Sequence, residues 1–200
     1  MSKINAICVY CGSSPGTEPA FLEAAQKFGK ILAENGVRLV YGGGSIGLMG
    51  ALAEAVLEHG GRVTGIIPEF LIRKEHAARG HEMVITRDMH ERKRKMFELA
   101  DAFVALPGGI GTLEELIELL TWAQLGQHRK PVLIANIKGF WDPLLSVFKQ
   151  MEAFQFIHSK HRFVYYVSKG IEEIFPTLSK AAASTFSQEE KRARVVIERM

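Results

Sequence analysis

Short apolar segments alternate with amphipathic segments along most of this chain, and the alternation limits the folds that it can adopt. The apolar segments are typical of buried strands, and the segments between them repeat apolar residues at helical spacing. We expect strands at residues 4–10, 37–41, 62–67, 82–86, 102–106, 131–135 and 163–167. We expect helices at residues 19–35, 89–100, 113–124, 141–154 and 171–183, and one more from the glycine-rich residues 42–50 to about residue 59.

Strands that alternate with helices form a mostly parallel sheet with helices on both faces. The sequence therefore predicts a doubly wound α/β fold, in which ligands bind at the carboxyl ends of the strands. Two hundred residues suit a single domain of this kind. We assign residues 1–183 to this domain and residues 184–200 to a charged helical tail, where Ser187-Gln188-Glu189-Glu190 fits a capping box.

The composition is that of a globular protein outside the membrane. Hydrophobic residues make up 47% of the chain and charged residues 24%. No apolar run reaches the roughly 18 residues of a membrane-spanning helix. The N-terminal residues also lack the apolar core and cleavage site of a signal peptide. We therefore expect a cytoplasmic protein that has no membrane partner.

The charge and the cysteines narrow the range of partners and cofactors. A net charge of +3 fits an anionic small ligand as readily as nucleic acid, but no aromatic residues interleave the basic run at 92–95, so we expect no nucleic-acid partner. The two cysteines, Cys8 and Cys11, share one predicted strand at a spacing that points them to opposite faces. A second cysteine pair is absent and the seven histidines show no metal-binding spacing, so we expect no metal.

A glycine-rich turn at residues 107–112, Pro-Gly-Gly-Ile-Gly-Thr, joins a predicted strand to a predicted helix. Glycine lets a ligand approach the backbone, and the free N–H groups and positive dipole of a helix N-terminus bind anions such as phosphate. Glu115 lies one turn into this helix, and a carboxylate beside a phosphate suggests chemistry on a nucleotide. The same residues fit a capping box in which Thr112 is the N-cap and Glu115 its partner. Both roles of Glu115, catalytic and structural, stay open at this point.

Two further loops follow strands at the same expected edge of the sheet, Gly12-Ser13-Ser14 and Gly42-Gly43-Gly44-Ser45. The second begins a Gly-x-Gly-x-x-Gly pattern between a strand and a helix, as in dinucleotide-binding folds. Glu69 follows the next strand at about the spacing of the acidic residue that binds the ribose in those folds. The pattern follows the second strand rather than the first, so NAD binding and a purely structural turn are both alternatives.

The helix predicted at residues 89–100 carries an arginine on its apolar face. Arg92 and Lys93 follow Met89 at the i+3 and i+4 positions, which share one face of a helix. The other residues of this face are Met96, Phe97 and Ala100. An inward-facing arginine needs an anionic partner, so we expect Arg92 to contact either a ligand phosphate or Glu115.

Three segments together resemble a known family. Residues 107–115 match a Pro-Gly-Gly-x-Gly-Thr-x-x-Glu signature, residues 89–93 (Met-His-Glu-Arg-Lys) match a second, and residues 42–50 match a third. From about residue 4 to residue 183 the chain is similar to the Lonely Guy (LOG) family, the cytokinin riboside 5′-monophosphate phosphoribohydrolases, whose members have often been labelled possible lysine decarboxylases. The resemblance implies a Rossmann-like fold and hydrolysis of the N-glycosidic bond of a purine nucleotide, AMP included, to a free base and ribose 5-phosphate. It implies no cofactor.

The resemblance also implies roles for single residues. Arg92 and Glu115 fall on the catalytic positions of the family. Members of this length are typically homodimers with active sites near the subunit interface, and position 110, often tyrosine in relatives, is isoleucine here. The residues that we expect to bind the substrate are Gly12, Ser13, Gly43, Gly44, Glu75, Met89, Lys93, Gly108, Gly109, Ile110, Gly111, Thr112, Leu113, Glu114 and Thr121.

Other functions on the same fold are kept as alternatives. One is a non-catalytic protein that binds or senses nucleotides, and another is an NAD(P)-dependent enzyme that uses residues 42–47. Lysine decarboxylation is not expected, because it would normally need pyridoxal phosphate on a Schiff-base lysine and no lysine here lies in a motif for that role.

Overall fold

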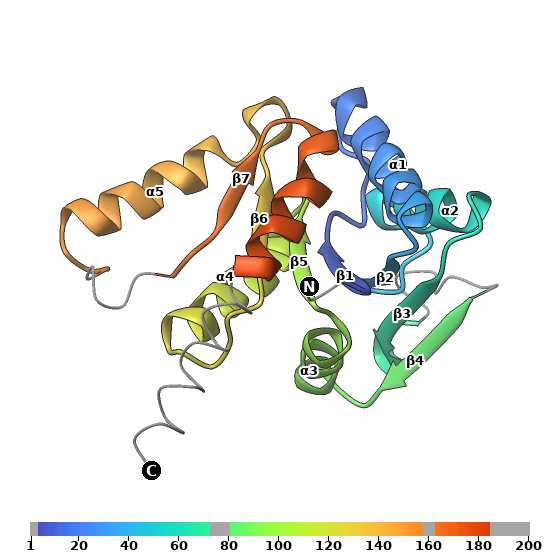
Figure 1. Cartoon of the computed structure of the whole chain (residues 1–200). Helices are drawn as coiled ribbons and strands as arrows, with labels where there is room; N and C mark the ends of the chain where they lie inside the picture. The colour runs from blue at the N-terminus through green and yellow to red at the C-terminus, as the bar shows by residue number, and fades with distance from the viewer. Residues whose placement is uncertain (1–3, 73–80, 158–162, 185–200) are drawn as a thin grey trace, which may run out of the picture.

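The structure is a computed structural model that describes residues 4–72, 81–157 and 163–184. Figure 1 shows an α/β fold in which one twisted sheet carries helices on both faces, as the sequence predicts. The expected helix of the charged tail, beyond residue 184, and the expected binding residue Glu75 lie outside the described residues.

The described residues form a seven-stranded sheet in the order β4-β3-β2-β1-β5-β6-β7. All of its neighbouring strands pair in parallel, so the prediction of a doubly wound, mostly parallel sheet is confirmed. The strands are β1 (Ala6–Tyr10), β2 (Arg38–Tyr41), β3 (Val63–Pro68), β4 (Glu82–Thr86), β5 (Ala102–Ala105), β6 (Val132–Ala135) and β7 (Tyr166–Ser168). The last strand begins later than expected, because its pairing with β6 begins only at Tyr166.

Helices cover both faces of the sheet. They are α1 (Pro19–Glu34), α2 (Gly47–Glu58), α3 (Met89–Leu99), α4 (Ile110–Gln124), α5 (Asp142–Ala153) and a helix over residues 174–184, with short 3-10 turns at η1 (Glu69–Leu71), η2 (Ile137–Gly139) and η4 (Ile171–Glu173). One hydrophobic core joins α1, α2 and the helix at 174–184 to the sheet, and a second core joins α3, α4 and α5 to the opposite face. Among the described residues, no helix has the length and apolarity to cross a membrane.

The central strands are buried on both faces, which explains their continuous apolar sequences. Along β1, Ile7 and Val9 point into the core with α1 and α2, whereas Cys8 and Tyr10 point into the core with α3 and α4. Cys11 lies just beyond the strand, in the same core as Val9. The expectation that the two cysteines face opposite sides is confirmed, and both are buried free thiols.

The order of the strands places an opening between β1 and β5. The chain builds β1 to β4 outward on one side and then returns to place β5 directly beside β1. Loops after two such strands diverge to opposite faces and leave a crevice where ligands bind in α/β sheets. The amide of Gly12, after β1, donates a hydrogen bond of 3.1 Å to the carbonyl of Pro107, after β5. The two loops are therefore joined at the base of the crevice.

Close packing of α1 on α2 depends on Gly29. A Cβ atom at this position would lie 2.6 Å from the carbonyl oxygen of Leu52 and 2.8 Å from the Cβ of Ala55. We expect Gly29→Ala to lower the free energy of unfolding by about 1–3 kcal/mol, because the two helices must separate. Urea denaturation followed by circular dichroism measures this change.

Gly111→Ala is the matched control, since Gly111 is also helical but an added Cβ would meet no atom within 4 Å. Alanine favours a helix over glycine by up to about 1 kcal/mol, so this variant should be as stable as the original protein or slightly more stable. Equal stability of Gly29→Ala and the original protein would contradict the packing argument.

Candidate active site

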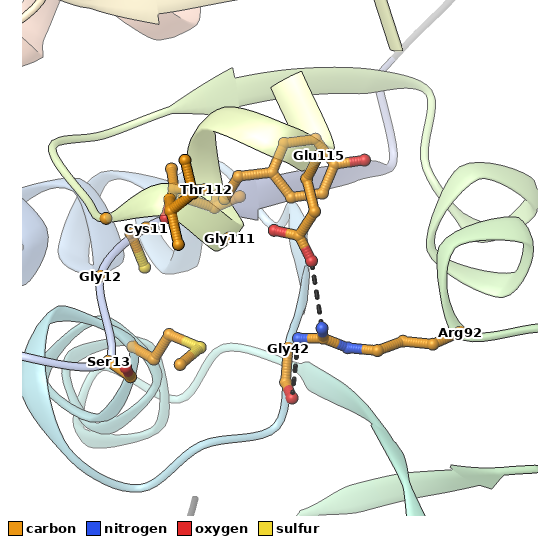
Figure 2. Close-up of a pocket in the computed structure, with 13 residues that line it drawn as sticks. Cys11, Gly12, Ser13, Gly42, Arg92, Gly111, Thr112 and Glu115 are labelled. Carbon is orange, nitrogen blue, oxygen red and sulfur yellow. Dashed lines mark hydrogen bonds and ion pairs between the residues drawn. The ribbon is translucent and has the colours of Figure 1, made fainter. Parts of the chain in front are cut away.

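A cavity of about 290 Å³ lies at the carboxyl ends of β1 and β5. Its wall comes from the loop after β1, the residue after β2, and the N-terminal parts of α2, α3 and α4 (Figure 2). The lining residues are Val9, Tyr10, Cys11, Gly12, Ser13, Gly42, Met49, Arg92, Gly109, Ile110, Gly111, Thr112 and Glu115. The glycine-rich turn, the loop after β1 and the arginine of α3 therefore meet at one place.

The N-terminus of α4 opens into this cavity. The helix begins at Ile110 rather than at residue 113, and its N-cap, Gly109, supplies no side-chain hydrogen bond. The N–H groups of the first helical turn have no partner within the helix, and they carry the positive end of its dipole. An added Cβ would meet no atom within 4 Å at either Gly109 or Gly111, so the backbone is open to a guest. This is the geometry of an anion site.

The capping-box hypothesis for Thr112 and Glu115 is wrong. Thr112 is the third residue of α4 rather than its N-cap, and its side chain is buried. Figure 2 shows the Glu115 carboxylate pointing across the cavity toward Arg92, which comes from the opposite side. Nη1 of Arg92 lies 3.2 Å from Oε1 of Glu115, and both side chains are less than 10% exposed.

Two backbone carbonyls hold the other side of the Arg92 guanidinium. Nε donates to the carbonyl of Ile66 at 3.1 Å, and Nη2 donates to the carbonyl of Gly42 at 3.4 Å. These carbonyls belong to β3 and to the residue after β2, so the sheet fixes the direction of the side chain. The sequence predicts either a phosphate or Glu115 beside Arg92, and the structure places Glu115 there.

Gly42 was not among the expected site residues, yet it determines where Arg92 can lie. A Cβ atom on Gly42 would stand 2.2 Å from Nη2 of Arg92 and 3.1 Å from Sδ of Met49. The guanidinium therefore occupies the space that any other residue would fill with its side chain. The only signal in the sequence is the place of Gly42 directly after a buried strand, at the start of the glycine pattern.

Apolar residues at the end of β1 also line the cavity. Burial raises the pKa of Tyr10 well above its usual value, and the nearby Cys8 and Glu115 raise it further. Burial likewise raises the pKa of the Cys11 thiol, to which the charge of Glu115 adds. Both groups are therefore neutral at neutral pH, and Glu115 and Arg92 are the charged side chains in the cavity wall.

The dinucleotide pattern at residues 42–47 has a structural role here. The N–H groups of Leu48 and Met49, in the first turn of α2, both donate to the carbonyl of Gly12, at 3.0 and 3.2 Å. Gly47 has a φ of 65°, and a Cβ on it would lie 2.3 Å from the backbone of Ser13. The N-terminus of α2 is thus closed by the loop after β1, which argues against the NAD interpretation. The expected binding residues Gly43 and Gly44 are buried and do not line the cavity, and Gly43 packs against Ile66, Ile67 and Met83 of β3 and β4.

The remaining expected residues do not line the cavity, and Thr121 lies toward the opposite end of α4. Sδ of Met89 lies 3.9 Å from Nη1 of Arg92. Gly108 packs tightly, since a Cβ on it would stand 2.2 Å from Oγ1 of Thr112. On α4, Leu113 packs into the core, Glu114 pairs with Lys93, and the hydroxyl of the exposed Thr121 donates to the carbonyl of Ile117. The described residues contain no group of three His, Cys, Asp or Glu side chains that could hold a metal ion.

Known proteins resemble this chain over most of its length. The family described as "possible lysine decarboxylase" matches residues 49–178. The cytokinin riboside 5′-monophosphate phosphoribohydrolase LOG of Oryza sativa subsp. japonica is 53% identical over 146 residues, which cover 72% of this chain and 60% of the rice protein. A probable cytokinin riboside 5′-monophosphate phosphoribohydrolase of the same plant is 48% identical over 161 residues, which cover 80% and 72%.

The fold is also shared with a solved structure of lower sequence identity. The Moco carrier protein of Chlamydomonas reinhardtii superposes with a TM-score of 0.69 at 20% identity, covering 91% of this chain and 99% of that protein. At this identity the similarity shows the fold alone. The two signatures that bring Arg92 and Glu115 together both lie within the residues that the family matches. The chain therefore belongs to the LOG family, which is the family described as possible lysine decarboxylase.

Proposed function

We propose that this protein hydrolyses the N-glycosidic bond of cytokinin riboside 5′-monophosphates, and of AMP, and releases the free base and ribose 5-phosphate. The names of its relatives support this substrate class. The observation that carries the proposal is the buried pair of Arg92 and Glu115, 3.2 Å apart, on the wall of a cavity that also receives an open helix N-terminus. The anion site at the N-terminus of α4 and the Glu115 carboxylate lie one helical turn apart. This spacing suits a substrate in which a ribose ring separates the 5′-phosphate from C1′, the reacting carbon.

The 5′-phosphate binds in this proposal to the N-terminus of α4. Gly109, Ile110, Gly111 and Thr112 all line the cavity, and the first-turn N–H groups supply donors and the positive end of the helix dipole. Gly12 and Ser13 close the site from the loop after β1. Fixing the phosphate fixes the ribose relative to Glu115, which lowers the entropic part of the barrier.

Glu115 stabilises the charge that develops on the sugar. As the bond between C1′ and the base lengthens, the electron pair leaves with the base and the ribose becomes positively charged. A buried carboxylate beside C1′ stabilises this charge more strongly than it would in water. Glu115 also orients a water molecule and accepts its proton as the water oxygen bonds to C1′. The departing base takes a proton from solvent, and Glu115 then returns its own proton to solvent, so that the carboxylate is restored.

We further propose that the protein is a cytoplasmic homodimer in which residues 1–183 form the catalytic domain and 184–200 the tail. Support for the homodimer comes from exposed apolar side chains along α4, from Ile110 in the cavity wall to Leu125 just beyond the other end of the helix. Ile110 is 82% exposed and Leu125 68% exposed. Thr121 lies on the same outer stripe of the helix, midway between Ile117 and Leu125 at i+4 spacing. A second copy on this stripe would bring Thr121 to the subunit interface.

A base-release assay over matched nucleotides and nucleosides tests the proposal. Isopentenyladenosine monophosphate and AMP should yield free base and ribose 5-phosphate, detected by chromatography. The corresponding nucleosides should react at least roughly 100-fold more slowly, because the phosphate is the group that positions the ribose. Equal rates for nucleosides would contradict the phosphate site at α4. Tight binding of the monophosphates by calorimetry, with no base released, would show a nucleotide-binding protein instead of an enzyme.

Glu115→Gln keeps the shape of the side chain but removes its charge. We expect the rate of base release to fall by about 100-fold or more, since the developing positive charge loses its partner. The buried guanidinium of Arg92 would face a neutral amide, so stability should fall by up to about 3–5 kcal/mol while the variant stays folded at low temperature. Circular dichroism and AMP calorimetry check folding and binding. Full activity in this variant would show that Glu115 has only a structural role.

Gly42→Ala should displace the Arg92 guanidinium without unfolding the protein. The added Cβ meets the end of a flexible side chain, at 2.2 Å, so the side chain can move away while the backbone stays in place. We expect kcat to fall roughly tenfold or more, because Glu115 loses the aligned cation. Gly170→Ala is the control, since a Cβ there meets only ordinary contacts beginning at 3.6 Å, outside the cavity. Unchanged kcat in Gly42→Ala would show that the position of Arg92 does not limit the rate.

A further inference from the structure

A second ionic contact joins α3 to α4 directly beside the catalytic pair. Lys93 is the next residue after Arg92 on α3, and Glu114 precedes Glu115 on α4. Nζ of Lys93 lies 2.6 Å from Oε1 of Glu114 and also bonds to Oε2 of Glu118. Glu114 and Glu118 are four residues apart, so they share one face of α4 and receive the lysine between them.

The surroundings of Lys93 differ from those of an exposed lysine. Its side chain is only 12% exposed, and Glu118 is 26% exposed. Burial by itself lowers the pKa of Lys93, but its hydrogen bonds and charge interactions with Glu114 and Glu118 outweigh that effect and raise the pKa overall. The ammonium group is therefore charged and held by two carboxylates. Partly buried pairs of this kind are stronger than exposed ones, which contribute little.

The place of this contact matters for the reaction. Arg92 and Glu115 come from different helices, so their 3.2 Å separation depends on how α3 and α4 are held against each other. The Lys93 contacts and the edge-to-face packing of Phe97 on Trp122 also link these two helices, and Met96 shares a hydrophobic core with the buried face of α4. Lys93 lies next to the catalytic pair, whereas Phe97 lies more than a turn farther along α3. Lys93 itself does not line the cavity.

We propose that Lys93 is a positioning residue, which holds α3 against α4 through Glu114 and Glu118 and thereby sets the distance between Arg92 and Glu115. This inference rests on the proposed function for its kinetic consequences. It differs from the expectation that the family resemblance sets for Lys93, namely direct contact with the substrate. The two roles make opposite predictions for kinetic constants and for the partner residue Glu118.

Lys93→Met removes the charge and keeps the aliphatic length of the side chain. A positioning role predicts a kcat lower by roughly tenfold or more and a KM within about twofold of the original value, because a misplacement of about 1 Å can cost up to about 100-fold in rate. Lys93→Arg, which can bond both carboxylates, should recover most of the loss. Lys95→Met is the matched control: Lys95 pairs at 3.2 Å with Glu98 on its own helix, in an exposed contact that does not reach α4.

Glu118→Gln separates the two roles. If Lys93 acts through Glu118, this variant should also lower kcat, and the double variant with Lys93→Met should be no slower than Lys93→Met alone. If Lys93 instead binds the phosphate, loss of Glu118 would leave the ammonium freer for the substrate, so KM should fall. A raised KM with unchanged kcat in Lys93→Met, or additive effects in the double variant, would overturn the proposal.

A measurement without substrate tests the same inference independently of catalysis. The Nε–H of Arg92 donates to the carbonyl of Ile66, so it should give a protected signal in the ¹H–¹⁵N NMR spectrum, assigned by its loss in Arg92→Lys. This signal should shift or exchange faster in Lys93→Met and stay unchanged in Lys95→Met. An unchanged signal in Lys93→Met would overturn the positioning role. Absence of base release by the original protein would overturn the proposed function alone, because the NMR result does not depend on turnover.

Discussion

The ion pair of Arg92 and Glu115 is the interaction on which the site depends. Removing two charges from water costs several kcal/mol for each ion, and their attraction offsets that only when the geometry is good. Here the geometry comes from the sheet, because carbonyl groups of Ile66 and Gly42 bind the guanidinium from the side opposite to Glu115. A buried pair is weak evidence for stability, so its presence at the wall of a cavity points to chemistry as its purpose.

Glycines shape the site at the carboxyl ends of β1 and β5, and they do so in three different ways. Gly108 and Gly12 allow the two loops to pack together at the floor of the crevice. Gly42 leaves room for the Arg92 guanidinium, and Gly109 and Gly111 leave the first turn of α4 uncovered. Glycines that look alike in the sequence thus have different roles, which only their neighbours in space define.

The fold could be predicted largely from the sequence, because strands buried on both faces are continuous apolar runs and their order along the chain implies a parallel sheet. Arg92 could be found because a charge on an apolar helix face is unusual, and Glu115 because it lies one turn beyond the glycine-rich turn. The start of α4 was missed, since glycine and isoleucine at its first positions are weak helix formers. Gly42 was missed because its role is set by a side chain fifty residues away in the sequence. Tyr10, Cys11 and Met49 carry no signal either, as each reads as an ordinary buried residue.

The carbonyl of Gly12 closes the N-terminus of α2, and this limits the kind of phosphate ligand that the site can bind. Two helix N-termini, those of α2 and α4, converge on the same edge of the sheet, and each would attract an anion if it were open. The carbonyl oxygen of Gly12 accepts hydrogen bonds from the N-terminus of α2, whereas the N-terminus of α4 stays open to a ligand. In dinucleotide-binding folds the pyrophosphate lies at the helix N-terminus that follows the glycine pattern, and here that is the N-terminus closed by Gly12. The backbone hydrogen bonds at the N-terminus of α2 thus favour a mononucleotide over a dinucleotide before any side chain contacts the base.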